Sequence, residues 1–163
     1  MNKLQTTGDN IVEGLNNVVH VIAEGLSAGD GLMVDSKTRR PLRVYLIEDS
    51  PEVRDLLVVI LHAPGEVEIV GHSDTECESV AAILADPVDA VVVDLNLREG
   101  SGMAIIEQIR KANLDPRPKI IVFTNDPFPE TRRRAMELEA DYFFDKSLDY
   151  KTVRDTLQKL RLN

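Results

Sequence analysis

Short apolar runs alternate with helix-period segments from Arg43 onward, and this alternation limits the possible folds more than any other feature of the sequence. The apolar runs are continuous, which is typical of strands that are buried on both faces of a parallel sheet. Parallel strands need right-handed crossover connections, so the pattern predicts an α/β fold with a doubly wound sheet. The five predicted strands span residues 43–50, 66–72, 90–94, 119–125 and 141–146.

Five helical segments follow these strands. In the first segment, Val53, Leu56, Leu57 and Ile60 fall on one helical face, which predicts an amphipathic helix. The later segments carry start signals, namely Asp74 or Thr75 as a cap, Ser101 or Gly102 at a turn, and a proline in the first turn. The predicted helices span residues 51–63, 74–85, 102–112, 129–140 and 149–162.

The length of 163 residues accommodates one domain with a substantial core, which we place at residues 42–163, and an extension at residues 1–41. Within the extension, Ile11, Leu15 and Val18 have helical spacing and predict an amphipathic helix followed by a polar linker. Its apolar face would be buried on the main domain, a second copy or another protein. A simpler interpretation is that Met33 is the natural start.

Composition excludes several classes of function. The formal net charge is −9 and Trp is absent, which argues against a nucleic-acid-binding surface. The single cysteine, Cys77, cannot form an intrachain disulfide, and no apolar run is long enough to span a membrane. The N-terminal residues are too polar for a secretory signal, so we expect a cytoplasmic protein without nucleic-acid or membrane partners.

Polar residues stand at the end of four of the predicted strands. Glu48 and Asp49 end the first, Asp94 the third, Thr124 the fourth and Lys146 the fifth. In doubly wound sheets the carboxyl ends of the strands form the ligand-binding edge, so we expect these side chains to converge. Three close carboxylates repel one another unless a cation neutralises them, and Mg²⁺ prefers such oxygen ligands.

Mg²⁺ bound by a few carboxylates usually also binds a phosphate oxygen, so the cluster indicates phosphoryl chemistry. Aspartate is able to attack phosphorus as a nucleophile. Asp94 is the best candidate because it leads directly into a turn-forming loop that a donor can approach. Lys146 and Thr124 would then offset the charge on the phosphoryl oxygens.

The motifs IEDS, VVVDLNL with GSG, VFTN and FFDKS occur in this order, and with them residues 43–163 resemble a response-regulator receiver domain of two-component signalling. The resemblance implies a flavodoxin-like strand order of 2-1-3-4-5. It also implies that Asp94 receives a phosphoryl group from a histidine kinase or phosphotransfer protein. Thr124 and Lys146 would bind the phosphoryl oxygens, and Phe143 would be the aromatic that turns inward with the threonine. The implied Mg²⁺ ligands are Glu48, Asp49, Asp94 and the backbone carbonyl of Asn96.

The chain departs from the usual receiver pattern at three positions. Receivers commonly have a proline after the lysine, joined to it by a cis peptide bond, but here Ser147 follows Lys146. A cis bond is unfavourable before a residue other than proline, so the geometry of this loop is left open. Arg98 replaces a frequent proline, and we expect it to loosen the loop or to contact the kinase. Asn125 follows Thr124 where a small residue is common, and we expect it to narrow access to the site.

No output segment follows the last predicted helix, so the resemblance implies a single-domain response regulator that acts through a protein partner. In this family the partner-binding face is built from the fourth helix, the fifth strand and the fifth helix, here within residues 129–162. The fourth helix carries a basic cluster at residues 131–135, for which a solvated surface, an acidic partner and a homodimer contact are all open interpretations.

Two alternatives compete with the phosphorylation switch. One is a receiver-like adaptor that binds its partner without phosphorylation. The other is a hydrolase with an aspartyl-phosphate intermediate, such as a haloacid-dehalogenase-type phosphatase. Those enzymes usually need a second aspartate two residues after the nucleophile, and this chain has Asn96 there. We therefore expect no enzymatic activity beyond self-catalysed phosphorylation and dephosphorylation.

Overall fold

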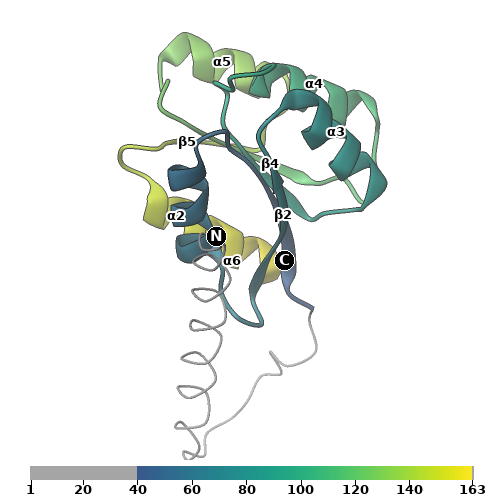
Figure 1. Ribbon diagram of the computed structural model, residues 1–163, viewed down its shortest axis with the longest axis vertical. Coiled ribbons are helices and arrows are strands. Elements are labelled where there is room, and N and C mark those ends of the chain that lie inside the picture. The colour runs from purple at the N-terminus through teal and green to yellow at the C-terminus, as the bar shows by residue number, and fades with distance from the viewer. Residues whose placement is uncertain (1–39, 163) are drawn as a thin grey trace, which may run out of the picture. The chain divides into compact units, whose positions relative to one another are not determined.

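The computed structural model describes residues 40–162, which form a five-stranded parallel sheet with helices on both faces (Figure 1). The strand order is β2-β1-β3-β4-β5, and every neighbouring pair is parallel. This confirms the predicted fold class and the 2-1-3-4-5 order. The strands are β1 (Leu42–Ile47), β2 (Val67–Ser73), β3 (Ala90–Val93), β4 (Lys119–Thr124) and β5 (Tyr142–Asp145). The helices are α2 (Pro51–Leu61), α3 (Glu76–Ala85), α4 (Gly102–Lys111), α5 (Pro129–Glu137) and α6 (Tyr150–Leu162).

Two hydrophobic clusters cover the two faces of the sheet. Successive strand side chains point to opposite faces, so Val91 and Val93 of β3 enter one cluster while Ala90 and Val92 enter the other. Helices α3, α4 and α5 cover the first face, and α2 and α6 cover the second (Figure 1). All four residues of β3 are buried, which explains why this strand reads as a continuous apolar run.

Side-chain caps start three of the helices. The hydroxyl of Ser50 accepts the backbone N–H of Val53 in α2, and Thr75 caps α3 in the same way. Ser101 caps α4 by accepting the N–H of Met103, so Gly102 is the first helical residue. These caps satisfy backbone N–H donors that have no partner within the helix. They therefore define the residue at which each loop ends and the following helix begins.

Several element boundaries and one helix face differ from the predictions. Strand β1 ends at Ile47, before the acidic pair, and α5 ends at Glu137. Helix α5 stops early because Glu139 adopts a φ of 66°, which a continuing helix does not allow. The predicted apolar face of α2 is not buried throughout, since Leu56 is 46% exposed whereas Leu57 is 2% exposed. Helix α2 is apolar on all sides from Leu56 to Leu61, so periodicity alone does not identify its buried face.

The predicted amphipathic helix and the Met33 start lie outside the described residues. Of the predicted extension at residues 1–41, the structure describes only Arg40 and Pro41. Within residues 40–162, none of the helices has the length and apolar character that crossing a membrane requires.

Candidate functional site

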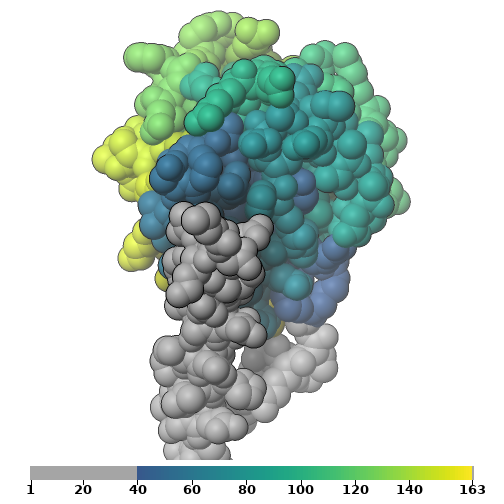
Figure 2. Space-filling model, in the orientation of Figure 1, coloured from purple at the N-terminus to yellow at the C-terminus, as the bar shows by residue number. Residues whose placement is uncertain are grey.

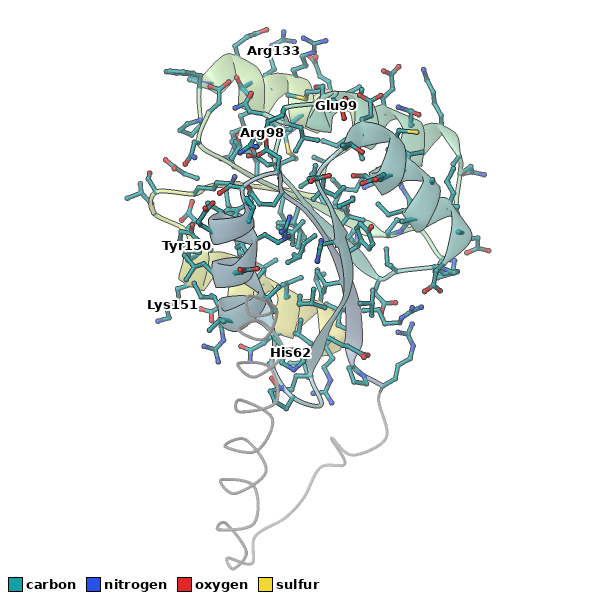
Figure 3. The ribbon with its side chains drawn as sticks, in the orientation of Figure 1. His62, Arg98, Glu99, Arg133, Tyr150 and Lys151 are labelled. Carbon is teal, nitrogen blue, oxygen red and sulfur yellow. The ribbon has the colours of Figure 1, made fainter. Side chains whose placement is uncertain are left out.

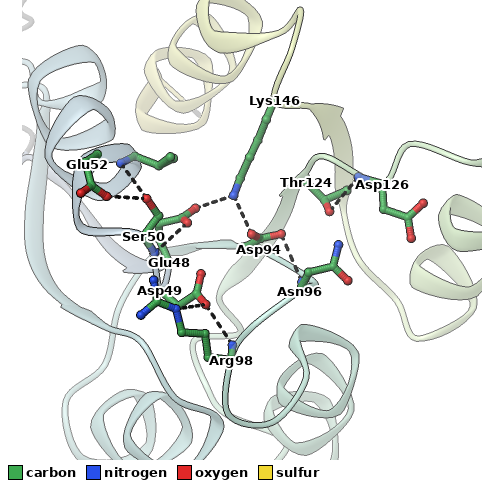
Figure 4. Close-up of polar contacts among 11 residues, drawn as sticks. Glu48, Asp49, Ser50, Glu52, Asp94, Asn96, Arg98, Thr124, Asp126 and Lys146 are labelled. Carbon is green, nitrogen blue, oxygen red and sulfur yellow. Dashed lines mark hydrogen bonds and ion pairs between the residues drawn. The ribbon is translucent and has the colours of Figure 1, made fainter.

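The carboxyl ends of β1, β3 and β5 bring together three buried charged residues (Figure 4). Glu48 follows β1, Asp94 follows β3 and Lys146 follows β5, and each is at most 7% exposed. The Lys146 Nζ donates hydrogen bonds of 2.6 Å to Oε2 of Glu48 and 2.6 Å to Oδ2 of Asp94. One buried ammonium therefore joins two buried carboxylates from neighbouring strands.

Asp49 completes a group of three carboxylates with Glu48 and Asp94. One oxygen from each residue lies within 4.8 Å of the other two. This donor set fits Mg²⁺, which prefers hard oxygen ligands and takes its remaining positions from water, carbonyls or phosphate. The backbone N–H of Asn96 donates to Oδ1 of Asp94 at 3.2 Å, so the predicted carbonyl ligand belongs to the turn beside the acid.

Burial and charge act in opposite directions on this cluster. Burial raises the pKa of Glu48, and the hydrogen bond and charge of Lys146 offset that rise only in part. Burial alone would lower the pKa of Lys146, but its bonds to Asp94 and Glu48 outweigh burial and raise it. Lys146 therefore stays charged at neutral pH, and this one buried ammonium bonds to two members of a cluster of three carboxylates.

Thr124 lies at the end of β4 and is fully buried. Its Oγ1 accepts the backbone N–H of Asp126 at 3.2 Å, and Oδ2 of Asp126 accepts the hydroxyl of Thr131 in α5 at 3.2 Å. The other carboxylate oxygen of Asp126 is buried without a hydrogen-bond partner. The Thr124 hydroxyl is thus bonded toward the loop before α5.

Phe143 is buried on the face of the sheet that α3, α4 and α5 cover. The guanidinium of Arg132 lies 5.4 Å from the centroid of its ring, within range of a cation–π contact. Tyr142 and Phe144 pack on the opposite face, where their rings stack with centroids 6.2 Å apart. Phe143 thus lies on the opposite face of the sheet from its two aromatic neighbours, as the alternation of strand side chains requires.

The loop from Asp94 to Ser101 is held by contacts that the sequence analysis missed. A Cβ on Gly102 would lie 2.1 Å from the carbonyl oxygen of Asp94, so only glycine fits this close approach. The carboxylate of Glu76 accepts hydrogen bonds from the backbone N–H of Ser101 at 3.0 Å and from Gln108 at 2.8 Å. The Gly-Ser-Gly turn in the sequence indicated that Gly102 has a special backbone role. No feature of the sequence indicated the contact of Glu76, which is distant along the chain.

The loop after Lys146 has a trans bond between Lys146 and Ser147, because the one cis peptide bond within residues 40–162 joins Asp115 to Pro116. The carboxylate of Asp145 accepts the backbone N–H of Ser147 at 2.7 Å and its hydroxyl at 2.6 Å. The backbone N–H of Lys146 bonds to the carbonyl of Thr124 at 2.9 Å. A serine-bonded turn therefore positions the lysine here.

Arg98 ties its loop to Asp49 rather than loosening it. The backbone N–H of Arg98 donates to Oδ2 of Asp49 at 2.9 Å, and its Nε lies 3.5 Å from the same oxygen (Figure 4). Figure 3 shows Arg98 and Glu99 toward one end of the sheet and His62, which follows α2, toward the other. Asn125 is exposed, and its predicted effect on access remains a prediction.

Comparisons with known proteins agree with this architecture. The family model described as the response regulator receiver domain matches residues 44–158. The receiver domain of the response regulator NarL from Mycobacterium tuberculosis superimposes with a TM-score of 0.69, covering 76% of this chain and 98% of that one at 19% identity. At this identity the structural likeness concerns the fold.

Two curated relatives match part of their own length. A protein-glutamate methylesterase/protein-glutamine glutaminase from Agrobacterium fabrum is 38% identical over 80 residues, which cover 49% of this chain and 22% of that protein. The transcriptional regulatory protein BtsR from Salmonella typhi is 29% identical over 122 residues, which cover 74% of this chain and 48% of that protein. The chain thus spans half or less of these relatives.

Proposed function

Since the chain belongs to the response regulator receiver domain family, we propose that it is a phosphorylation-controlled switch in which Asp94 accepts a phosphoryl group. The donor would be a histidine kinase or a phosphotransfer protein. The observation that carries the proposal is the buried arrangement of Asp94 with Lys146 at 2.6 Å and with two further carboxylates within 4.8 Å. This arrangement would offer a nucleophile, a fixed cation and a metal site at one edge of the sheet.

A carboxylate oxygen of Asp94 would attack the phosphorus of a phosphohistidine and form a new P–O bond. The P–N bond breaks, and the leaving imidazole keeps the electron pair and takes up a proton from solvent. Lys146 lies close enough to Asp94 to donate to the phosphoryl oxygens, which carry the charge of the transition state. Glu48, Asp49, Asp94 and the carbonyl of Asn96 would hold Mg²⁺, which supplies further positive charge at those oxygens when bound.

Phosphorylation would then change the loop that precedes α5. The Thr124 hydroxyl accepts the N–H of Asp126 in the described state, so a turn toward a phosphoryl group breaks this bond. Phe143 packs beneath Arg132 of α5, and we propose that it moves with Thr124. The change would alter partner binding on the face of α5, β5 and α6, where Phe128 is 69% exposed. In Figure 2 the side chains of α5 project at the top of the view.

The test is the intact mass of the full chain after incubation with acetyl phosphate and Mg²⁺. We expect a gain of one phosphoryl group that requires Mg²⁺ and disappears in Asp94→Asn. Asp89→Asn is the matched control, because Asp89 precedes the same strand at its other end, where it pairs with Arg40 at 2.6 Å. This variant should still gain the phosphoryl group.

Two results would contradict the proposal. One is an adduct that Asp94→Asn retains, which would place the acceptor elsewhere. The other is no adduct together with no binding of beryllofluoride, a stable mimic of the phosphoryl group, by the wild-type chain. That second result would support the adaptor that acts without phosphorylation.

A further inference from the structure

A second cation of the protein touches the acidic cluster. Arg98 contacts Asp49 from the loop between β3 and α4, through its backbone N–H at 2.9 Å and its Nε at 3.5 Å. Lys146 instead bonds to Glu48 and Asp94. The two cations are thus divided among the three carboxylates, a buried one on two acids and an exposed one on the third.

The exposure of the two cations differs. The side chain of Lys146 is 5% exposed, whereas that of Arg98 is 79% exposed and that of Asp49 is 16% exposed. Lys146 is therefore fixed by its surroundings, while the Arg98 guanidinium is able to leave its carboxylate for solvent. Exposed ion pairs are individually weak, so this contact is easily exchanged for another cation.

We propose that Arg98 is an internal counter-ion that competes with the divalent cation for Asp49 and thereby sets the Mg²⁺ affinity of the site. This inference rests on the proposed function, since it assumes that Mg²⁺ binds the three carboxylates. Both Arg98 donors use the same oxygen, Oδ2, which leaves Oδ1 of Asp49 available to a metal.

Competition follows from charge at short range. A divalent ion on Asp49 would repel a guanidinium that stays 3.5 Å from the same carboxylate, so metal binding favours an outward movement of the Arg98 side chain. The backbone N–H of Arg98 carries no net charge and keeps its bond. Removing the guanidinium should therefore strengthen Mg²⁺ binding while the loop stays anchored.

The experiment is a Mg²⁺ titration of the full chain by isothermal calorimetry at low ionic strength. We expect Arg98→Gln to lower the Mg²⁺ dissociation constant by roughly two- to fivefold, the range of an exposed ion pair. Arg98→Lys keeps the charge and should stay near the wild-type value. Added salt should shrink the difference between Arg98→Gln and wild type, because salt screens exposed charges.

Arg117→Gln is the matched control. It removes the same charge from a residue that is 56% exposed and paired with Glu139, before the start of β4 at the other edge of the sheet. We expect its Mg²⁺ affinity to equal that of wild type. An equal gain in Mg²⁺ affinity in Arg98→Gln and Arg117→Gln would show that the gain comes from the change in net charge alone, and it would overturn the proposal.

Two further results separate this inference from the function beneath it. If wild type binds Mg²⁺ and Arg98→Gln binds it equally or more weakly, the counter-ion proposal is wrong while the phosphoacceptor proposal stands. If folded wild-type protein binds no Mg²⁺, both proposals fail. Urea unfolding of each variant verifies that all four chains are equally folded during the titration.

Discussion

The two edges of the sheet both gather charged side chains, but they balance the charges differently. At the amino edge, the carboxylate of Asp141 accepts hydrogen bonds from Arg110 at 2.7 Å, Lys119 at 2.8 Å and the backbone N–H of Ile120 at 2.8 Å. At the carboxyl edge, the single buried ammonium of Lys146 bonds to two of three clustered carboxylates, and only the exposed Arg98 contacts the third, Asp49. The amino edge thus has several donors for one acid, and the carboxyl edge has the reverse.

The pKa values of the two edges shift in opposite directions. Burial would raise the pKa of Asp141, but Lys119, the Ile120 N–H and Arg110 outweigh burial and lower it. Burial raises the pKa of Glu48, and Lys146 does not fully offset this. At the amino edge, the ionised form of the acid is favoured in the folded protein, so the network stabilises the fold. At the carboxyl edge, the negative charge is not fully balanced by the protein's own cations, so the cluster is suited to bind an added cation.

The largest expected effect comes from removing the buried cation at each edge. Arg110→Met should destabilise the fold by on the order of 3 kcal/mol. The Arg110 side chain is only 7% exposed, and the variant removes the hydrogen bonds that it donates to Asp141 and to the Pro118 carbonyl. Lys146→Met should cost a similar amount in a chelating buffer. Mg²⁺ should restore part of the stability of Lys146→Met and none of that of Arg110→Met, as measured by urea unfolding.

Lys119→Met serves as the control for this pair, since the Lys119 side chain is 49% exposed and its ion pair with Asp141 should contribute less than about 1 kcal/mol. Equal rescue of Arg110→Met and Lys146→Met by Mg²⁺ would show that the ion acts on the whole protein. The distinction between the two edges would then be lost.

The next effect concerns neutral replacements of one acid at each edge. Asp141→Asn should destabilise the fold by about 1–3 kcal/mol, because a carboxylate that accepts bonds from two cations becomes a neutral amide. Glu48→Gln should raise stability in a chelating buffer, because burial makes the charged form of Glu48 unfavourable. Urea midpoints that move in the same direction for both variants would contradict this prediction.

The sequence identified the carboxyl edge because strand order alone brings its residues together. Glu48, Asp94 and Lys146 each follow a buried apolar run, and the ends of parallel strands necessarily meet. The alternation of strand side chains places Phe143 on the opposite face from Tyr142 and Phe144, but its choice as the switch aromatic came from the family resemblance alone.

The amino-edge network and the Arg98 contact were not visible in the sequence. Arg110 and Asp141 are 31 residues apart, and their contact depends on how α4 packs over β4 and β5. Arg98 and Asp49 are 49 residues apart and meet only because two loops end at the same edge. The exposure of Leu56 was not visible either, because residues 56–61 of α2 are all apolar and leave no polar side to mark solvent. Contacts between loops and helix surfaces therefore require the structure.

The smallest expected effect is a difference in how stability depends on pH at the two edges. Asp141 has a folded pKa below its ordinary 3.8, so its contribution is present above pH 3.8 and is lost as the pH falls through the folded value. Glu48 has a folded pKa above its ordinary 4.5, so the folded state binds more protons and stability falls as the pH rises through that window.

Relative to wild type at pH 7, Asp141→Asn should be less stable and Glu48→Gln more stable. On acidification in a chelating buffer, the Glu48→Gln difference should shrink as the pH falls toward 4.5 and vanish below it, and the Asp141→Asn difference should vanish only below its folded pKa, which lies below 3.8. Urea unfolding at pH 3–7 measures both differences, and a Glu48→Gln advantage that grows on acidification would mean that the carboxyl edge is as well compensated as the amino edge.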